Sequence, residues 1–166
     1  MSEHDWTRFT KRITIDAPID AVYRAWATRD GIESWFLRLS EISNAAGHVR
    51  PASEFAAAGD RYRWLWHGWP DEVEERGAII EANGADRFAF TFHDPMTVLV
   101  TIRPEHGITV CELTQENIPE DDFARANYFF GCSEGWTFYL ANLKSILEGG
   151  IDLRNKNPEI KKVINS

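Results

Sequence analysis

The chain of 166 residues has the length of one domain, and a composition of 43% hydrophobic and 13% aromatic residues excludes a disordered polar chain. Its 26 acidic and 18 basic residues give a net charge of −8, which argues against nucleic acid as a partner, because phosphates are bound by clustered cations. The first residues lack the apolar run of a signal peptide, and no stretch approaches the ~20 apolar residues that cross a bilayer. We therefore expect a cytoplasmic protein that does not bind membranes.

The N-terminal third of the chain predicts one strand followed by two short helices. Residues alternate in polarity from Phe9 to Ile15, as in a half-buried strand. Pro18 suits a first helical position, and apolar residues from Ile19 to Trp26 recur at spacings of three and four. The same spacing predicts a second short helix around Ile32–Phe36. Residues 40–60 show no periodic pattern, so we expect a loop there, of a length often found in lids or binding loops.

Five runs of strand-forming residues follow the loop. Segments rich in Gly, Pro, Asn and Asp separate them, and such short connections favour hairpins. The runs therefore predict an antiparallel meander. They are Tyr62–His67, Glu74–Glu81, Arg87–His93, Thr97–Arg103 and Ile108–Glu116.

A long amphipathic helix is predicted from Phe123 to Glu148, because apolar residues recur along one face and Gly149-Gly150 ends the pattern. Gly131 and Gly135 lie inside this helix, where each costs about 1 kcal/mol relative to Ala. Two explanations stay open at this point. The glycines leave room for a ligand beside the helix, or they allow the sheet to approach it closely.

This order of elements predicts an α+β protein in which a six-stranded antiparallel sheet wraps around a long C-terminal helix, with two short helices after the first strand. A sheet with a ring-lined face cannot leave that face in water, and the long helix is the one element large enough to cover it. We expect one domain over residues 8–154, followed by a polar tail at 155–166 without assigned structure.

Several motifs in this order are similar to those of a known superfamily. They are the run Ile15-Asp16-Ala17-Pro18 continuing to Trp26, then Trp35-Phe36, Glu134-Gly135-Trp136 and the ending Leu147–Asp152. With these motifs the chain resembles the START-like (SRPBCC) superfamily, and more closely the branch related to the C-terminal domain of the activator of Hsp90 ATPase. The resemblance implies a helix-grip (START/Bet v 1-like) fold with a cavity between sheet and helix. It also implies a lipid or another apolar ligand in that cavity.

Aromatic and aliphatic side chains from the sheet and the long helix should converge inside such a fold. A cavity lined mainly by rings suits an apolar ligand, but the same rings could instead fill a close-packed core. The candidate ligand-binding residues are Trp35, Phe36, Tyr62, Trp64, Trp66, Phe88, Phe90, Phe92, Val98, Val100, Trp136, Tyr139 and Leu140.

No catalytic residue, metal ligand or cofactor is assigned from the sequence. Ser133 lacks the preceding strand of a nucleophile elbow, although Glu134 or Tyr139 would serve as an acid if either projected into the cavity. His67, His93 and Asp94 lie at the ends of predicted strands but lack the spacing of a zinc site. Cys111 and Cys132 are expected to be buried thiols, not a redox pair.

Three classes of function follow from these observations. The first is a module that binds a small hydrophobic molecule, the second is an enzyme that acts on such a molecule, and the third is a protein-interaction module. A homodimer and an Hsp90-type chaperone are the protein partners considered for the third class, the latter only through the resemblance. We expect the first class.

Overall fold

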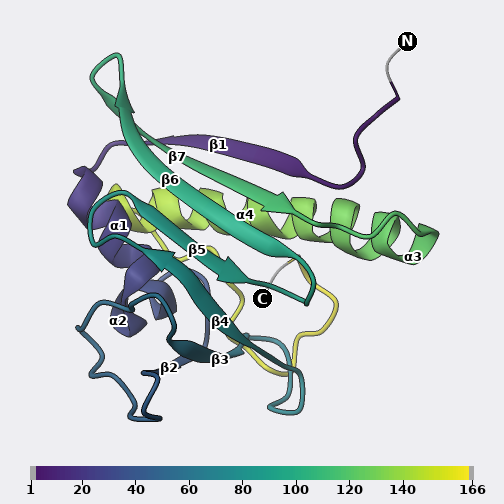
Figure 1. Cartoon of the computed structure of the whole chain (residues 1–166), viewed down its shortest axis with the longest axis horizontal. Coiled ribbons are helices and arrows are strands. Elements are labelled where there is room, and N and C mark those ends of the chain that lie inside the picture. The colour runs from purple at the N-terminus through teal and green to yellow at the C-terminus, as the bar shows by residue number, and fades with distance from the viewer. Residues whose placement is uncertain (1–2, 165–166) are drawn as a thin grey trace.

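One antiparallel sheet of seven strands organises the chain in the computed structural model, which describes residues 3–164 (Figure 1). The strands lie in the order β1-β7-β6-β5-β4-β3-β2, so each strand from β2 onward pairs with the next, and β1 pairs with β7. Their bounds are β1 Phe9–Ile15, β2 Leu39–Ser43, β3 Arg61–Leu65, β4 Glu74–Ala82, β5 Arg87–Thr91, β6 Thr97–Glu105 and β7 Ile108–Glu116.

The α+β helix-grip architecture is confirmed, but the expected number of six strands is wrong. The additional strand is β2, at the start of the segment 40–60 that was expected to be a loop. Ser40 in β2 is buried because its hydroxyl accepts a hydrogen bond of 3.0 Å from Nε1 of Trp64. A polar residue at a buried position conceals the alternation that marks a strand in sequence. The remainder of 40–60 is irregular apart from a bridge between Ser43 and Val49.

Two short helices and one long helical run complete the fold. The helices α1 (Ile19–Ala27) and α2 (Arg29–Glu33) follow β1 as predicted, although α2 ends before Trp35. The long predicted helix consists of α3 (Asp122–Ala124), the π-helical segment η1 (Arg125–Phe130) and α4 (Gly131–Leu147). Figure 1 shows this run lying along one face of the sheet. Within residues 3–164, no helix has both the length and the apolar character needed to cross a membrane.

Aromatic rings fill most of the space between the sheet and α4. Trp26, Trp35, Trp64 and Phe90 are each at most 1% exposed. The ring centres of Trp64 and Phe90 lie 5.0 Å apart in an edge-to-face arrangement, which aromatic pairs prefer. Interiors packed in this way leave little room for a ligand along most of the sheet.

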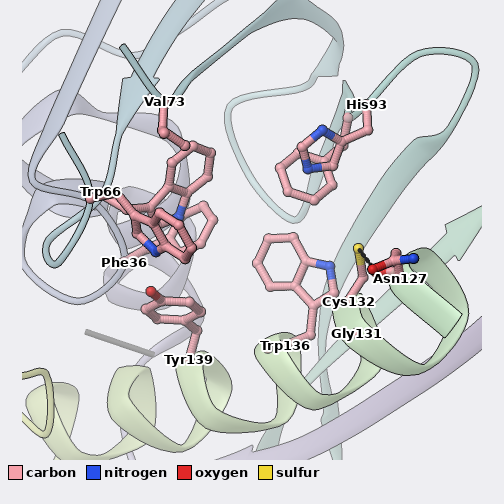
Figure 2. A pocket seen from close by; sticks show the side chains of 12 residues that line it. Phe36, Trp66, Val73, His93, Asn127, Gly131, Cys132, Trp136 and Tyr139 are labelled. Carbon is pink, nitrogen blue, oxygen red and sulfur yellow. Dashed lines mark hydrogen bonds between the residues drawn. The ribbon is translucent and has the colours of Figure 1, made fainter. Parts of the chain in front are cut away.

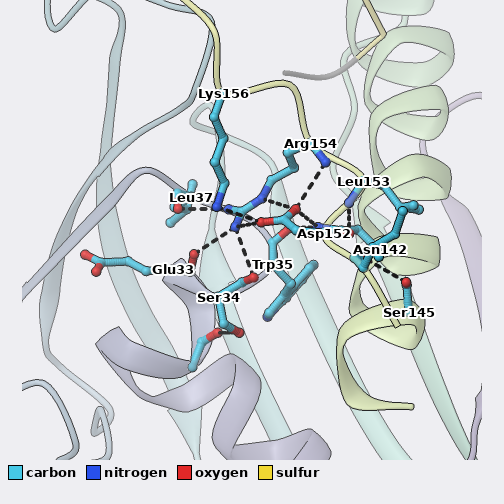
Figure 3. Close-up of polar contacts among 12 residues, drawn as sticks. Glu33, Ser34, Trp35, Leu37, Asn142, Ser145, Asp152, Leu153, Arg154 and Lys156 are labelled. Carbon is cyan, nitrogen blue, oxygen red and sulfur yellow. Dashed lines mark hydrogen bonds and ion pairs between the residues drawn. The ribbon is translucent and has the colours of Figure 1, made fainter. Parts of the chain in front are cut away.

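A buried arginine ties the end of the chain to the segment between α2 and β2. The side chain of Arg154 is 1% exposed and donates hydrogen bonds to the carbonyls of Glu33 (3.1 Å), Ser34 (3.0 Å) and Leu37 (3.0 Å) (Figure 3). Its charge is balanced by Asp152, whose oxygens lie 2.9 and 2.7 Å from the guanidinium nitrogens. A planar guanidinium can satisfy several acceptors at once, which a lysine ammonium cannot do in the same geometry.

Asn142 of α4 extends this polar contact into the helix. It is fully buried, donates to the carbonyl of Trp35 (2.8 Å) and to Asp152 (3.0 Å), and accepts from the backbone of Leu153 (2.8 Å). Burial alone would raise the pKa of Asp152, but hydrogen bonds from Arg154 and its other neighbours hold that pKa well below its usual value. The carboxylate therefore stays ionised and joins the helix, the C-terminal segment and the turn at 33–37.

Removal of the buried Arg154 guanidinium tests how much these polar contacts stabilise the fold. We expect Arg154→Ala to lower the free energy of unfolding by about 3 kcal/mol, because three carbonyls lose their donor inside the protein and Asp152 loses its most buried partner. Lys156→Ala is the matched control, since Lys156 pairs with the same carboxylate but its side chain is 53% exposed. Its loss should stay below about 1 kcal/mol. Urea unfolding followed by circular dichroism measures both, and equal losses would contradict the assignment.

Candidate functional site

A cleft of about 350 Å³ opens between the N-terminal half of α4 and the ends of β3 and β5 (Figure 2). Its rim is exposed: Trp69 is 59% and Val73 is 43% accessible to solvent. A volume of this size is within the range of small-molecule sites. The residues that line it are Phe36, Trp66, Trp69, Val73, Phe92, His93, Asn127, Gly131, Cys132, Gly135, Trp136 and Tyr139.

The structure divides the sequence-predicted ligand-binding residues into two groups. Five of them line the cleft, and the other eight are at most 3% exposed within the packed core. The cleft group is Phe36, Trp66, Phe92, Trp136 and Tyr139. The core group is Trp35, Tyr62, Trp64, Phe88, Phe90, Val98, Val100 and Leu140. For the second group the structure therefore favours close packing, whereas ligand binding by the first group stays a prediction.

Strand ends separate the two groups. The runs predicted as Tyr62–His67 and Arg87–His93 pair only as far as Leu65 and Thr91. Rings inside these strands face α4 and are covered, whereas Trp66 and Phe92 follow immediately after the last paired residues and border the cleft. These two residues therefore lie at the end of the sheet, where they form part of the wall of the opening.

Several cleft residues were not assigned as ligand-binding from the sequence. Trp69 and Val73 come from the connection between β3 and β4, and Asn127 comes from η1. The sequence could have indicated Cys132, because it lies four residues before Trp136 and therefore on the same helical face. The connection and the π-helical segment have no such periodicity, so their contribution could not be read from a pattern.

The helical wall of the cleft departs from regular geometry where it meets the opening. The six residues of η1 precede Gly131, and π-helical segments often occur at functional sites. A Cβ added to Gly131 would meet only the carbonyl of Ala126, at an ordinary 3.6 Å. The sheet therefore does not press against this glycine, and the explanation that it leaves space in the cleft is the one the geometry favours. Gly135 also lines the cleft.

A buried hydrogen bond orients Trp136 at the floor of the cleft. Its Nε1 donates to Oε1 of Gln115 over 2.8 Å, and both residues are at most 2% exposed. The amide nitrogen of Gln115 in turn lies 3.2 Å from the sulfur of Met96. Because a buried indole N–H needs a partner, this bond holds the ring in one orientation.

Two neutral protic groups border the cleft from α4. Burial raises the pKa of the Tyr139 hydroxyl and of the Cys132 thiol, so both keep their protons at neutral pH. Figure 2 shows the Tyr139 hydroxyl directed toward Trp66 and Phe36. Within residues 3–164 this hydroxyl has no hydrogen-bond partner, which leaves it available to a ligand.

The residues considered for catalysis or metal binding do not form a reactive centre. Glu134 is exposed and does not line the cleft. Burial raises the pKa of the Cys111 thiol to about 12, and both cysteines are free. His67, His93 and Asp94 are not joined in one cluster, since no three His, Cys, Asp or Glu side chains converge in the part of the chain that the structure describes.

Comparison with known proteins identifies the family of this chain. The family model described as Activator of Hsp90 ATPase homolog 1-like protein matches residues 16–148. The chain belongs to this family. The match confirms the resemblance drawn from the motifs near both ends of the chain, and it spans every element that borders the cleft. No curated protein matches the chain significantly.

Solved structures of similar fold support the same architecture for this Hsp90 ATPase activator-like chain. A Staphylococcus saprophyticus protein is 20% identical, with a TM-score of 0.67 over 89% of this chain and 96% of its own. The Aha1 dimer from Colwellia psychrerythraea is 20% identical, with a TM-score of 0.64 over 86% of this chain and 97% of its own. DynU16, from the dynemicin biosynthetic locus, is 17% identical, with a TM-score of 0.66 over 90% of this chain and 50% of its own. At these identities the likeness is one of fold.

The space beside Gly131 leads to a prediction about helix stability. We expect Gly131→Ala to raise the free energy of unfolding by about 0.5–1 kcal/mol, because Ala favours a helix and its Cβ meets no close neighbour. Gly31→Ala in α2 is the control, since a Cβ there would lie 2.1 Å from the carbonyl of Arg24. That variant should be destabilised. Chemical denaturation measures both, and a loss of stability in Gly131→Ala would show that the helix needs glycine at this position.

Proposed function

We propose that this protein binds a small apolar molecule in the cleft beside α4. The observation that carries the proposal is an opening of about 350 Å³ with six aromatic side chains in its wall, within an interior that is otherwise densely packed. No Lys, Arg, Asp or Glu is among the residues that line it. Such a wall offers stacking and apolar contact, and only a few polar tips.

Solvent exposure of large apolar groups at the rim supports this proposal. Trp69 and Val73 lie open to water at the mouth of the cleft, while Phe92 and Trp136 form deeper parts of the same wall. Burial of apolar surface contributes about 25 cal/mol per Å², so a ligand that covers Trp69 and Val73 gains affinity from the area that it buries. The core residues behind them are already covered and offer no further gain.

An enzyme acting on the same molecule has less support. Among residues 3–164, neither the thiol of Cys132 nor the hydroxyl of Ser133 is hydrogen-bonded to an imidazole or a carboxylate that would activate it. The third class, a chaperone-related or self-associating module, is supported by the family and by the dimer reported for the Colwellia Aha1 protein. Among the described residues, no contact favours this class over ligand binding.

An environment-sensitive apolar probe tests the proposal. We expect N-phenyl-1-naphthylamine, an uncharged fluorescent probe, to bind the folded protein saturably and with one-to-one stoichiometry. Trp69→Ala should weaken this binding by roughly tenfold, or about 1.4 kcal/mol, while stability stays unchanged because Trp69 is 59% exposed.

Phe130→Ala is the matched control, because Phe130 is similarly exposed at 56% but does not line the cleft. The Phe130→Ala variant should bind the probe with the same affinity as the unmodified protein. Equal weakening in both variants would indicate nonspecific surface binding, and the absence of saturable binding would refute the proposal.

A further inference from the structure

His93 lies at the edge of the cleft, where Glu75 contacts both its imidazole ring and its backbone. Its Nδ1 lies 2.9 Å from Oε2 of Glu75, and its backbone N–H donates to Oε1 of the same carboxylate over 2.8 Å. The Glu75 side chain is only 13% exposed. His93 also has a φ of +48°, a left-handed conformation that non-glycine residues adopt rarely and that is frequent at functional sites.

Two aromatic neighbours fix the plane of the imidazole. The ring of Tyr128 is stacked on it at 5.6 Å and an angle of 20°, and the ring of Phe92 lies 4.4 Å away. Figure 2 shows His93 on the side of the cleft opposite Tyr139, with Trp136 below it. The ring is therefore oriented before any ligand arrives, which reduces the ordering that binding would require.

The carboxylate determines which nitrogen carries the proton in the neutral ring. Nδ1 lies 2.9 Å from a carboxylate oxygen that it would repel without a proton, so in the neutral ring the proton is on Nδ1 and Nε2 keeps its lone pair. Within the described residues, Nε2 has no hydrogen-bond partner. Nε2 is thus an acceptor with a fixed direction at the edge of the aromatic walls.

We infer that the cleft takes an aromatic molecule bearing a neutral hydroxyl, which donates its hydrogen bond to Nε2 of His93 while its rings pack against Trp136 and Phe92. The inference rests on the proposed function and specifies its ligand class. An anionic ligand is disfavoured, because no Lys or Arg lines the cleft and the Glu75 carboxylate stands behind the imidazole. A ligand that can only accept hydrogen bonds meets the lone pair of Nε2 and gains nothing from His93.

Naphthalene and three of its derivatives distinguish ligands that donate a hydrogen bond, ligands that only accept one, and anions. Naphthalene, 2-naphthol, 2-methoxynaphthalene and 2-naphthoate are titrated by calorimetry at about pH 8, where an ordinary imidazole is neutral. Displacement of the uncharged N-phenyl-1-naphthylamine locates them in the same cleft. We expect 2-naphthol to bind roughly tenfold more tightly than 2-methoxynaphthalene, and 2-naphthoate to bind least well.

Two variants assign that preference to the His93–Glu75 pair. In His93→Asn the preference for 2-naphthol should fall below about twofold, since Asn tolerates a left-handed backbone but is too short to replace the imidazole. In Glu75→Gln the amide oxygen keeps the bond to the backbone of His93 and the amide N–H faces Nδ1. The ring then carries its proton on Nε2, and the preference should reverse toward 2-methoxynaphthalene. His48→Asn, at an exposed site outside the cleft, should change nothing.

The outcomes separate the inference from the proposed function. Equal affinities for 2-naphthol and 2-methoxynaphthalene, or a preference for 2-naphthoate, overturn the inference but leave an apolar binding cleft in place. A preference that survives in both His93→Asn and Glu75→Gln shows that another group recognises the hydroxyl and also overturns it. Failure of all four compounds to bind overturns the proposed function itself.

Discussion

One long helix has to cover the ring-lined face of a seven-stranded sheet, and the position of the cleft follows from where that cover is incomplete. Along most of α4 the cover is tight, and rings such as Trp64 and Phe90 are shielded from water. The cover weakens at the start of α4, where η1 widens the helix and Gly131 and Gly135 present no side chain. An opening at that end does not interrupt the packed core behind it.

Polar contacts hold the walls of this opening in place. Gln115 orients Trp136 from below, Glu75 orients His93 at the rim, and Arg154 fastens the backbone on both sides of Phe36. Each contact is buried or partly buried, where an unpaired polar group would be costly. The walls are therefore positioned without a ligand, although they come from segments far apart in the sequence.

The sequence was sufficient for the parts of the fold that depend on periodicity. The strand Phe9–Ile15 and the long helical run were predicted because one face of each is buried and the pattern repeats. The strand β2 was not, because Ser40 is buried through a hydrogen bond to Trp64, a contact that no local pattern reveals. In the site, the sequence identified the aromatic rings but not which of them line the cleft. That distinction depends on where pairing ends, at Leu65 and Thr91.

The distribution of charge bears on what the cleft can recognise. The net charge of −8 is carried by acidic residues outside the cleft, since no Asp or Glu is among the residues that line it. His93 is the one imidazole among the lining residues, and the Glu75 carboxylate lies directly behind it. Long-range attraction therefore contributes little to selectivity in the cleft. Discrimination between ligands must come from the shape of the aromatic walls and from the direction of single hydrogen bonds, which favours uncharged molecules with one well-placed polar group.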